Sequence, residues 1–471
     1  MPESFVNPAA KHRAVANAVV YSRSADSKKN GQPSLGRPSS LAYATVLALL
    51  GLGFGISVGL PLVDGTSTEF HGPGGPAMFF GSLTGLAGTY LALVMVVLAA
   101  RLPALERMVG QGWVMHWHRR LAPYPIALIL IHTVLLSFAY AAAAKTGVLH
   151  EFSTIVATFP QMITATIAFG LMMLVGIVSI RQIRQYIKRE SWWLLHLTLY
   201  VALIISFAHE IVLGPSFVKH PLTQLLWSAA WILAAVLILT YRVLVPLYRT
   251  LLYQLEVEEI RPEGPGVISI ICRGKHLEQL RVAGGQFFEW RFLAPGLWWQ
   301  AHPFTVSSKP TPPTLRLTVK EVGDFSRALA SIPIGTKIAI EGPYGSFTTH
   351  HRLRDRSLLI AGGIGVTAVR PLLEDLPKKA KPVVIVRASS ATELTLREEI
   401  ERLALEKGGS VHYLVGPRSK VSLDAIGKLV PDIKKRDIFL CGSEEFVGAV
   451  TSVLHALRVE PGSIHHEAYS L

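Results

Sequence analysis

The sequence predicts a multi-domain membrane protein, in which a six-helix transmembrane bundle precedes an antiparallel β-barrel and then an α/β domain with a parallel sheet. Half of the 471 residues are hydrophobic and 17% are charged, against about 25% charged in ordinary soluble domains. Short alternating apolar runs broken by Gly and Pro follow Arg249, and strand-like runs alternate with helical ones from residue 357. This composition excludes a disordered chain, a collagen and a coiled coil.

Charge and cysteine content limit the partners and cofactors. The formal net charge of +14 suits an anionic membrane surface or an anionic cofactor, and we expect a lipid membrane rather than nucleic acid as partner. Cys272 and Cys441 form no CxxC motif and no disulfide framework, so a cysteine-ligated iron–sulfur cluster would need another chain. Any metal must therefore be held by His or carboxylate. The sequence predicts no oligomeric state.

Residues 1–40 are predicted to form a disordered basic tail, because Lys and Arg are scattered among Ser, Asn, Pro and Gly without apolar periodicity. A cleavable signal peptide is not expected, since its apolar stretch would directly follow a short basic start. The first apolar segment is therefore expected to remain in the membrane.

Residues 41–250 are predicted to form the membrane domain. A helix needs about 20 apolar residues to cross a bilayer, and six windows lack Asp, Glu, Lys and Arg: 41–63, 77–100, 121–144, 152–180, 191–209 and 220–241. Arginines gather after the second and fourth windows, whereas the other connections carry acidic residues or a single Lys. By the positive-inside rule both basic loops and both termini should be cytoplasmic, in what we expect to be the plasma membrane.

Histidines lie at matching depths in the third and fifth predicted spans. His118 and His132 are separated by nearly the same distance as His196 and His209, and the two helices run in the same direction. The imidazoles therefore form an inner and an outer pair, on the order of 20 Å apart along the helix axis. An iron porphyrin takes one axial nitrogen from each side, which two facing helices can supply. Polar helix contacts or a proton relay are the alternatives, and His116 could replace His118 if the third helix starts late.

Residues 251–350 are predicted to form the barrel and residues 351–471 the α/β domain. Runs such as YQLEVEEI, GVISIICRG and LRLTVKEV are typical of short antiparallel strands. Farther along, SLLIAGG, PVVIVRASS and DIFLCGS are separated by helical stretches, which is the order of a βαβ series with a parallel sheet.

The two histidine-bearing segments resemble a known family. WHRRLAPYPIALILIHT is similar to the third membrane helix, and SWWLLHLTLYVALIISFAH to the fifth, of the ferric reductase and NADPH oxidase superfamily of transmembrane flavocytochromes. The resemblance runs from about residue 41 to the C-terminus. It implies two b-type haems, an inner one on His118 and His196 and an outer one on His132 and His209, together with FAD and NAD(P)H.

The segment His302-Pro303-Phe304-Thr305 is similar to the HPFT motif of the same superfamily. In that family the strand of the motif lies along the flavin and its Thr hydroxyl reaches the ring system, so the resemblance implies a flavin site. A downstream helix start, with a hydroxyl and a nearby cation, suits a diphosphate, although an ordinary helix cap is the alternative. Family members commonly have Arg and Trp where this chain has Lys320 and Phe325. The FAD-binding candidates are His302, Pro303, Phe304, Thr305, Ser307, Lys320, Gly323 and Ser326.

A nucleotide site is predicted where a glycine cluster joins an apolar strand to a helix, because glycines let the backbone approach a pyrophosphate. A Cys-Gly turn after a later strand lies beside the nicotinamide in ferredoxin reductase-like enzymes, although Cys441 could also be a small buried residue. The candidates are Gly362, Gly363, Gly365, Thr367, Cys441 and Gly442.

The chain also carries candidates for cofactor choice and catalysis. Arg387, Ser389 and Ser390 end the second strand of the α/β domain, where a cation favours a 2′-phosphate. NADPH is therefore predicted over NADH, with a surface Arg that binds no ligand as the alternative. Tyr469 is expected to cover the flavin ring, as the terminal aromatic of family members does, unless the tail is frayed. Thr305, Cys441 and Tyr469 are the predicted catalytic residues.

These features predict an oxidoreductase that passes electrons from cytoplasmic NAD(P)H through FAD and two haems to a small-molecule acceptor outside. A ferric chelate is the expected acceptor, because short outer connections form a thin lid and carry possible iron ligands. A superoxide-producing NADPH oxidase, a membrane-anchored flavin reductase for a cytosolic partner, and a transporter with a nucleotide-sensing domain are the alternatives. The possible outer ligands are Asp64, Glu69, His71, His150, Glu151 and His220.

Overall fold

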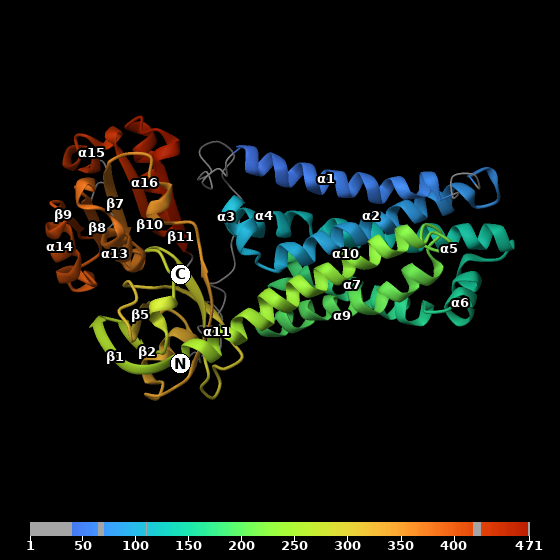
Figure 1. Cartoon of the computed structure of the whole chain (residues 1–471), viewed down its shortest axis with the longest axis horizontal. Helices are drawn as coiled ribbons and strands as arrows, with labels where there is room; N and C mark the ends of the chain where they lie inside the picture. Colours follow the sequence, from blue (N-terminus) through green and yellow to red (C-terminus); the bar gives the residue numbers. More distant parts are fainter. Residues whose placement is uncertain (1–39, 65–69, 110, 418–424, 470–471) are drawn as a thin grey trace, which may run out of the picture. The chain divides into compact units, whose positions relative to one another are not determined.

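The computed structural model of the chain describes residues 40–64, 70–109, 111–417 and 425–469 (Figure 1). The chain folds as two compact units, a membrane unit of residues 38–242 and a second unit that contains all residues from Val243 onward. The predicted basic tail falls almost wholly outside the described residues.

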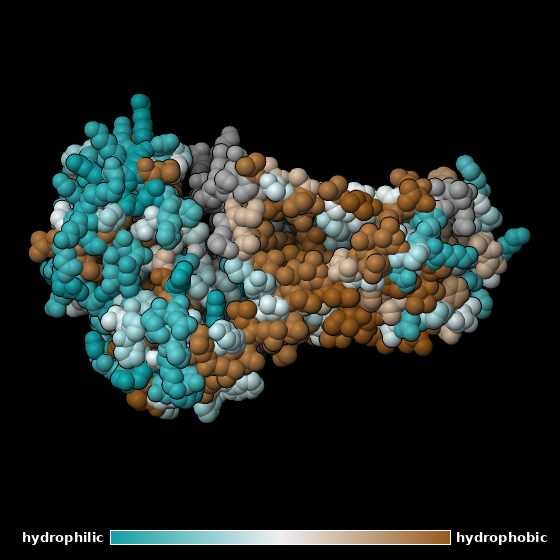
Figure 2. All heavy atoms as spheres, viewed as in Figure 1, coloured by the Kyte–Doolittle hydropathy of each residue, from teal (hydrophilic) through white to brown (hydrophobic). Residues whose placement is uncertain are grey.

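Six helical segments in the described part of the chain are long and apolar enough to cross a membrane, which confirms the predicted number of spans. Figure 2 shows hydrophobic residues over most of the visible face of the membrane unit. The candidate spans are Tyr43–Val63, Gly75–Ala99, Trp113–Ala144, Met162–Ser179, Ser191–Leu213 and Pro221–Tyr253. The helices are α1 Ser40–Val63, α2 Gly75–Ala99, α3 Pro103–Val109, α4 Gln111–Leu121, α5 Pro123–Ala144, α6 Val148–Thr158, α7 Met162–Ser179, α8 Arg181–Arg184, α9 Arg189–Leu213, α10 Pro221–Leu239 and α11 Val245–Tyr253.

The third span is longer than predicted and is built from two helices. It begins at Trp113 rather than at residue 121, because α4 and α5 follow one another with only Ala122 between them. Pro123 opens α5, where a missing backbone N–H costs nothing. His118 therefore lies within the third span on α4, while His132 lies on α5.

The fourth predicted span was wrong at its start. Residues 152–180 were expected to form one helix, but the chain forms α6 and then α7, which begins only at Met162. Pro160 lacks the backbone N–H that would continue α6, and Gln161 has a φ of 63°, which is not an α-helical conformation. The connection between the third and fourth spans is thus longer than the predicted loop of residues 145–151, and it contains a helix of its own.

The sixth span continues past its predicted end. A π-helix, Thr240–Leu244, joins α10 to α11, so the candidate span runs from Pro221 to Tyr253. Pro246 lacks the N–H that would bond the carbonyl of Arg242, which is a recognised cause of such a widened turn. The helix ends only three residues before the first strand of the barrel.

The predicted antiparallel barrel is confirmed. Its two sheets have the orders β1-β2-β5 and β4-β3-β6, and the bridges Val306↔Leu317 and Glu256↔Lys337 join them at both edges. Trp290 on β3 is fully buried in the barrel core, and burying a side chain of this kind contributes roughly 1.5–3 kcal/mol. The strands are β1 Glu256–Gly264, β2 Val267–Arg273, β3 Phe287–Phe292, β4 His302–Thr305, β5 Thr314–Lys320 and β6 Ile338–Tyr344, and the helix α12 Asp324–Ala328 follows β5.

The predicted parallel sheet is also confirmed, with the order β11-β10-β7-β8-β9. Helices α13 and α14 cover one face and α15 and α16 the other, each over its own hydrophobic cluster (Figure 1). The strand order reverses between β7 and β10, and doubly wound sheets bind ligands at the carboxyl ends of strands at such a switch point. The elements are β7 Arg356–Gly362, α13 Val366–Asp375, β8 Val383–Ala388, α14 Arg397–Glu406, β9 Ser410–Val415, α15 Ala425–Leu429, β10 Arg436–Ser443, α16 Glu444–Ala456 and β11 Ile464–Tyr469.

Candidate functional site

The inner histidine pair meets inside the membrane unit. The ring centroids of His118 on α4 and His196 on α9 lie 6.4 Å apart. The Nδ1 atoms of both rings are buried and have no hydrogen-bond partner among the described residues. Two metal–nitrogen bonds of about 2 Å each would set the centroids of two ligating imidazoles about 6 Å apart. The pair therefore has the separation that one iron between two imidazoles requires.

His116 is placed differently from His118. Its ring packs edge-on against Trp113 and Trp117, with centroid distances of 6.1 and 6.3 Å. The ring of His196, which faces His118, stacks on Trp192 with a centroid distance of 4.9 Å. The geometry thus favours His118 as the partner of His196, and the role of both as iron ligands stays a prediction.

The outer pair is oriented through backbone carbonyls. The Nδ1 atom of His132 lies 2.8 Å from the carbonyl of Gly81 on α2, and Nδ1 of His209 bonds the carbonyl of Ser206 one turn earlier. A carbonyl can only accept, so Nδ1 carries the proton and Nε2 keeps its lone pair, which is the tautomer that a metal-binding imidazole needs.

A glycine face on α2 makes room for His132, and we did not predict it. A Cβ on Gly85 would lie 2.5 Å from Nδ1 of His132, and one on Gly81 or Gly88 would meet Leu136 or Ile129 of α5. These three glycines share one helix face, since they are spaced by four and three residues. The i, i+4, i+7 spacing of glycines was the available signal for this close helix approach.

A buried carboxyl beside the outer pair was also missed. Glu210 of α9 accepts hydrogen bonds from Oγ1 of Thr89 on α2 at 3.2 Å and from Nε1 of Trp227 on α10 at 3.0 Å. It follows His209 directly in the chain. These bonds tie three helices together at the level of the outer pair, as buried polar groups in membrane segments commonly do.

The predicted flavin strand is β4, the strand at one end of the order β4-β3-β6. Nε1 of Trp290 donates to the carbonyl of Phe304 at 2.9 Å, which fixes the strand on the barrel core. Ser307 is buried, and its hydroxyl accepts a bond from Thr318 on β5 at 2.8 Å. Thr305 is half-buried at the end of the strand, while Pro303 is exposed.

The predicted diphosphate loop meets this strand through stacked rings. Phe325 of α12 stacks on His302 with a centroid distance of 3.8 Å. The backbone N–H groups of Val322 and Gly323 donate to Oγ of Ser326 at 2.9 and 3.0 Å. Ser326 therefore caps its own helix here, which is the alternative that the sequence left open, and Lys320 ends the neighbouring strand β5.

The glycine turn and the Cys-Gly turn meet at the switch point of the parallel sheet. Cys441 pairs with Ala361 across β7 and β10, and the hydroxyl of Tyr469 donates to the carbonyl of Gly362 at 3.0 Å. A Cβ on Gly365 would lie 3.0 Å from that hydroxyl. Tyr469 thus packs against the glycine turn from β11. Gly363 and Gly442 also belong to these two turns. The hydroxyl of Thr367 donates to the carbonyl of Ile364 at 2.9 Å.

Two ionisable groups are buried at this switch point. Cys441 is 2% exposed, and burial together with nearby Glu467 raises the pKa of its thiol well above the ordinary value. Glu467, opposite Cys441 on β11, is not among the residues that the sequence singled out. Its Oε2 atom is buried without a hydrogen-bond partner among the described residues, and burial raises the pKa of this carboxyl to about 7.

Arg387 does not present a free cation at the end of β8. It is 8% exposed, and its guanidinium donates to the backbone carbonyls of Ala388, Leu414 and Gly416, the last at 2.6 Å. These bonds tie β8 to the end of β9. Ser389 is exposed, and the hydroxyl of Ser390 bonds Thr392 at 2.8 Å.

An interdomain ion cluster, defined as Arg316, Arg370, Glu374 and Glu399, joins the barrel to the α/β part of the second unit. Both Nη atoms of Arg316 on β5 donate to Glu399 on α14, at 2.6 and 2.8 Å, and Nη2 also reaches the carbonyl of Ser307. Arg370 on α13 bonds Glu399 at 2.8 Å and Glu374 at 2.5 Å. The cluster therefore links the flavin strand to the helix that follows the glycine turn.

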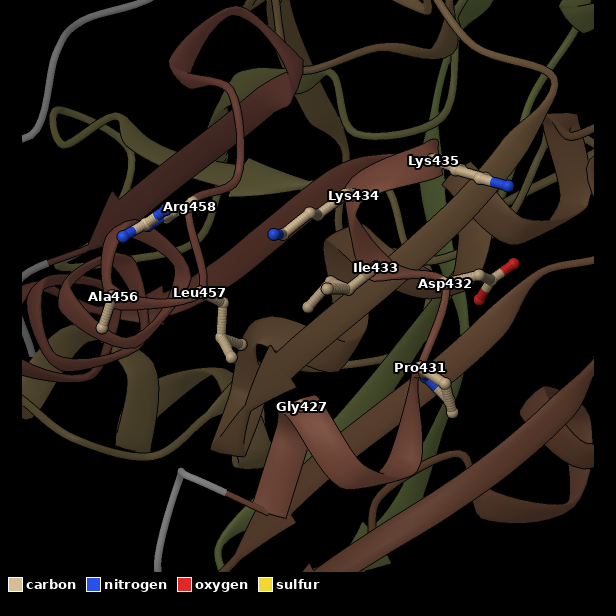
Figure 3. Close-up of a pocket in the computed structure, with 9 residues that line it drawn as sticks. All are labelled: Gly427, Pro431, Asp432, Ile433, Lys434, Lys435, Ala456, Leu457 and Arg458. Carbon is tan, nitrogen blue, oxygen red and sulfur yellow. The ribbon is translucent and has the colours of Figure 1, made fainter.

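A hollow of about 580 Å³ lies elsewhere on the α/β part. Lys434 and Arg458 extend over it in the same direction, whereas Lys435 points away (Figure 3). Because Lys434 and Lys435 precede β10, while Cys441 lies near its other end, the hollow lies at the opposite end of the strand from the predicted nucleotide site.

The predicted outer ligands do not assemble into a metal site within the described residues, where no group of three or more His, Cys, Asp or Glu could hold a metal ion. Asp64 accepts a bond from Ser216, and Glu151 accepts one from Thr146 at 2.9 Å. His71 packs edge-on against Phe70, and Glu69 lies outside the described residues. The other two are His150 in the first turn of α6 and His220 at the start of α10.

Comparisons with known proteins identify both parts of the chain. Residues 84–207 match the ferric reductase like transmembrane component, and residues 264–348 match an FAD-binding domain. Ferric/cupric reductase transmembrane component 1 of Candida albicans is 24% identical over 75% of this chain and 45% of its own length. The stachydrine N-demethylase reductase subunit Stc4 of Rhizobium meliloti is 28% identical over 44% of this chain and 64% of its own length. The chain thus spans roughly half to two thirds of these curated relatives.

Among solved structures, the flavohem-like FAD/NAD binding domain of nitric oxide dioxygenase from Vibrio cholerae is 22% identical, with a TM-score of 0.39 over 46% of this chain and 98% of that one. The cytochrome b5 reductase domain of Ulva prolifera nitrate reductase is 20% identical, with a TM-score of 0.40 over 46% and 97%. The two sequence families, each found in oxidoreductases, occur here in the order membrane component then FAD-binding domain. The chain therefore combines a region similar to the ferric reductase like transmembrane component with one similar to an FAD-binding domain, as its resemblance to the ferric reductase and NADPH oxidase superfamily implies.

Proposed function

We propose that the chain carries electrons across a membrane, from cytoplasmic NAD(P)H through FAD and two b-type haems to an acceptor on the outer side. When bound, FAD converts the two-electron hydride into the single electrons that haem irons accept. The observation that carries this proposal is the inner pair, His118 and His196, with ring centroids 6.4 Å apart in a chain that also has an FAD-binding domain. The positive-inside rule supports cytoplasmic termini, and the plasma membrane is the proposed location.

In this proposal the histidines hold the irons and the backbone orients the histidines. The carbonyl acceptors of His132 and His209 keep Nε2 available. At the switch point, Tyr469 is proposed to cover the flavin ring beside the glycine turn, where the nicotinamide would enter; the bond from its hydroxyl to the carbonyl of Gly362 supports this place. The ion cluster holds that turn and the flavin strand in one arrangement, as hydride transfer requires of its two reactants.

A ferric chelate is the proposed acceptor, with oxygen as the second candidate. The support is the similarity to a ferric/cupric reductase transmembrane component over 75% of this chain. A thin outer lid does not support this choice, because the connection between the third and fourth spans contains the helix α6. A membrane-anchored flavin reductase would need neither histidine pair.

Sealed vesicles with NADPH on the face that carries the second unit distinguish these acceptors. We expect anaerobic reduction of an enclosed ferric chelate, and this reduction should disappear in His132→Leu while the flavin is still reduced. Fast superoxide-dismutase-sensitive turnover in air, with negligible ferric reduction without oxygen, would assign an oxidase instead. Reduction that persists in His132→Leu would point to the flavin reductase.

The donor within NAD(P)H is proposed to be NADPH, and kcat/KM with each nucleotide tests it. A preference for NADPH that survives Arg387→Ala would assign recognition to Ser389 and Ser390, as expected from the buried guanidinium. Loss of the NADPH preference in Arg387→Ala would assign recognition to Arg387. Equal efficiency in the unmodified protein would refute the preference.

A further inference from the structure

One end of the barrel exposes large apolar side chains that the proposed function does not use. Leu293 is 45% exposed, Trp298 61% and Ile334 62%, and we call these three the barrel rim. Leu293 and Trp298 lie in the connection from β3 to β4, and Ile334 lies just before β6. The backbone N–H of Leu293 donates to the carbonyl of Lys337 at 2.8 Å, so the two segments lie side by side.

The same end of the barrel receives α11. Tyr253, the last residue of α11, is buried in the barrel core. Two residues later, the carbonyl of Leu255 accepts a bond from the N–H of Ile338 at 2.8 Å, next to Lys337. Two residues of chain span at most about 7 Å. The rim thus lies close to the end of Pro221–Tyr253, a helix long and apolar enough to cross a membrane.

The exposed face of α11 continues this apolar surface. Leu247, Tyr248 and Leu251 of α11 are exposed, as is Leu244 directly before the helix, and their i, i+3, i+4, i+7 spacing places them on one side. Figure 2 shows hydrophobic residues on the visible face of the helix that leads into the barrel. An apolar stripe that follows directly from a membrane span is expected to lie against lipid.

The chemistry of the rim suits the boundary between hydrocarbon and water. Trp is enriched there because its ring is apolar and its N–H is polar. Arg291 lies beside the rim, with Nη1 donating to the carbonyl of Trp298 at 3.0 Å. A cation next to exposed apolar side chains can approach an anionic headgroup while those side chains enter the acyl boundary.

We propose that the barrel rim and the exposed face of α11 insert into the lipid headgroup region of the membrane. The strand β4 begins at this same end, because His302 pairs with Trp290 near the end of β3. Lipid contact at the rim would therefore hold the start of the flavin strand at the membrane surface. This inference rests on insertion of the spans and on no redox step.

Site-directed spin labelling of the full chain tests the proposal. Cys272 and Cys441 are buried, so an introduced exposed cysteine is labelled selectively. Trp298→Cys and Ile334→Cys report on the rim, and Leu405→Cys, 77% exposed on α14, is the matched control. The labelled proteins are placed in nanodiscs of equal parts phosphatidylcholine and phosphatidylglycerol. Relaxation by oxygen is then compared with relaxation by a water-soluble nickel chelate.

We expect oxygen to relax the rim labels more than the nickel chelate does, and the reverse at residue 405. Rim labels that behave like the control would show a solvated surface and overturn the proposal. Rim labels shielded from both reagents would show that protein covers the rim, which also overturns it. Two independent rim sites guard against a variant that fails to fold. The readout needs neither haem nor turnover, so it stands apart from the electron-transfer proposal.

Discussion

At the scale of single residues, the imidazoles of the outer pair are the groups whose removal has the clearest consequence. His132→Leu removes the nitrogen that we predict to ligate the outer iron, so about half of the haem should be lost. The haem content per protein, measured by the pyridine haemochrome method, checks this result. His116→Leu is the matched control, because His116 packs between Trp113 and Trp117 and should leave the haem content unchanged. Equal loss in both variants would contradict the pairing.

Gly85 is predicted to be irreplaceable because of one close approach. An added Cβ would lie 2.5 Å from Nδ1 of His132, so Gly85→Ala must displace the ring from the Gly81 carbonyl. We expect reduced haem content, even though Ala is favoured over Gly inside helices by about 1 kcal/mol. Gly170→Ala on α7 is the control, since nothing lies within 4 Å of its added Cβ. Full haem content in Gly85→Ala would contradict this prediction, since α2 would then accommodate the added Cβ without displacing the ring.

The buried carboxyl of Glu467 should make stability depend on pH. Burial raises its pKa from 4.5 to about 7 in the folded state, so unfolding releases a proton between these values and stability falls as the pH rises through this window. Glu467→Gln removes the free-energy cost of burying an ionised carboxylate. Its Tm should therefore exceed that of the parent at pH 8 by more than it does at pH 5. An equal difference at both pH values would mean that the carboxyl is solvated, and Glu398→Gln, at an exposed site on α14, serves as control.

At the scale of elements, the ion cluster fixes α13 and α14 on the barrel. Burial would raise the pKa of Glu399, but Arg316 and Arg370 hold it below the usual value. The carboxylate therefore contributes stability that is present at neutral pH and is lost as the pH falls through its lowered pKa.

Glu399→Gln should thus destabilise the protein at pH 7 by about 1–3 kcal/mol, between the effects typical of surface and of buried ion pairs. It should also lower kcat for hydride transfer more than it raises the KM for the nucleotide, because the barrel and glycine turn are less firmly aligned. Chemical unfolding and stopped-flow flavin reduction measure the two effects. Glu406→Gln on the same helix breaks only an exposed pair with Arg402 and should change neither.

The elements that sequence patterns predicted poorly are those where a proline interrupts a long apolar stretch. Residues 152–180 lack charges throughout, so hydropathy alone cannot separate α6 from α7, and Pro160 was the local signal for the break. Pro246 similarly marks the π-helix between α10 and α11. Helix breaks depend on one backbone N–H, whereas hydropathy averages over many side chains.

At the scale of the whole molecule, the six spans, the antiparallel barrel and the parallel sheet could all be predicted, because each rests on an apolar run or a periodicity within a short window. The partners of Arg316 could not, since Glu399 is 83 residues away and only the fold brings the two together. Glu210 and Glu467 were missed for a related reason. A single acidic residue in an apolar run carries no pattern, and its burial becomes visible only in the structure.

If one chain joins flavin chemistry to a pair of haems, its visible spectrum will show both kinds of cofactor. The protein is purified in detergent, reduced with NADPH without oxygen, and its reduced-minus-oxidised spectrum is recorded with haem and FAD quantified. We predict two low-spin, bis-imidazole b-type haems for each FAD, both reduced through the flavin. A preparation that binds FAD and bleaches it with NADPH but contains no haem would show that the two histidine pairs do not hold haem.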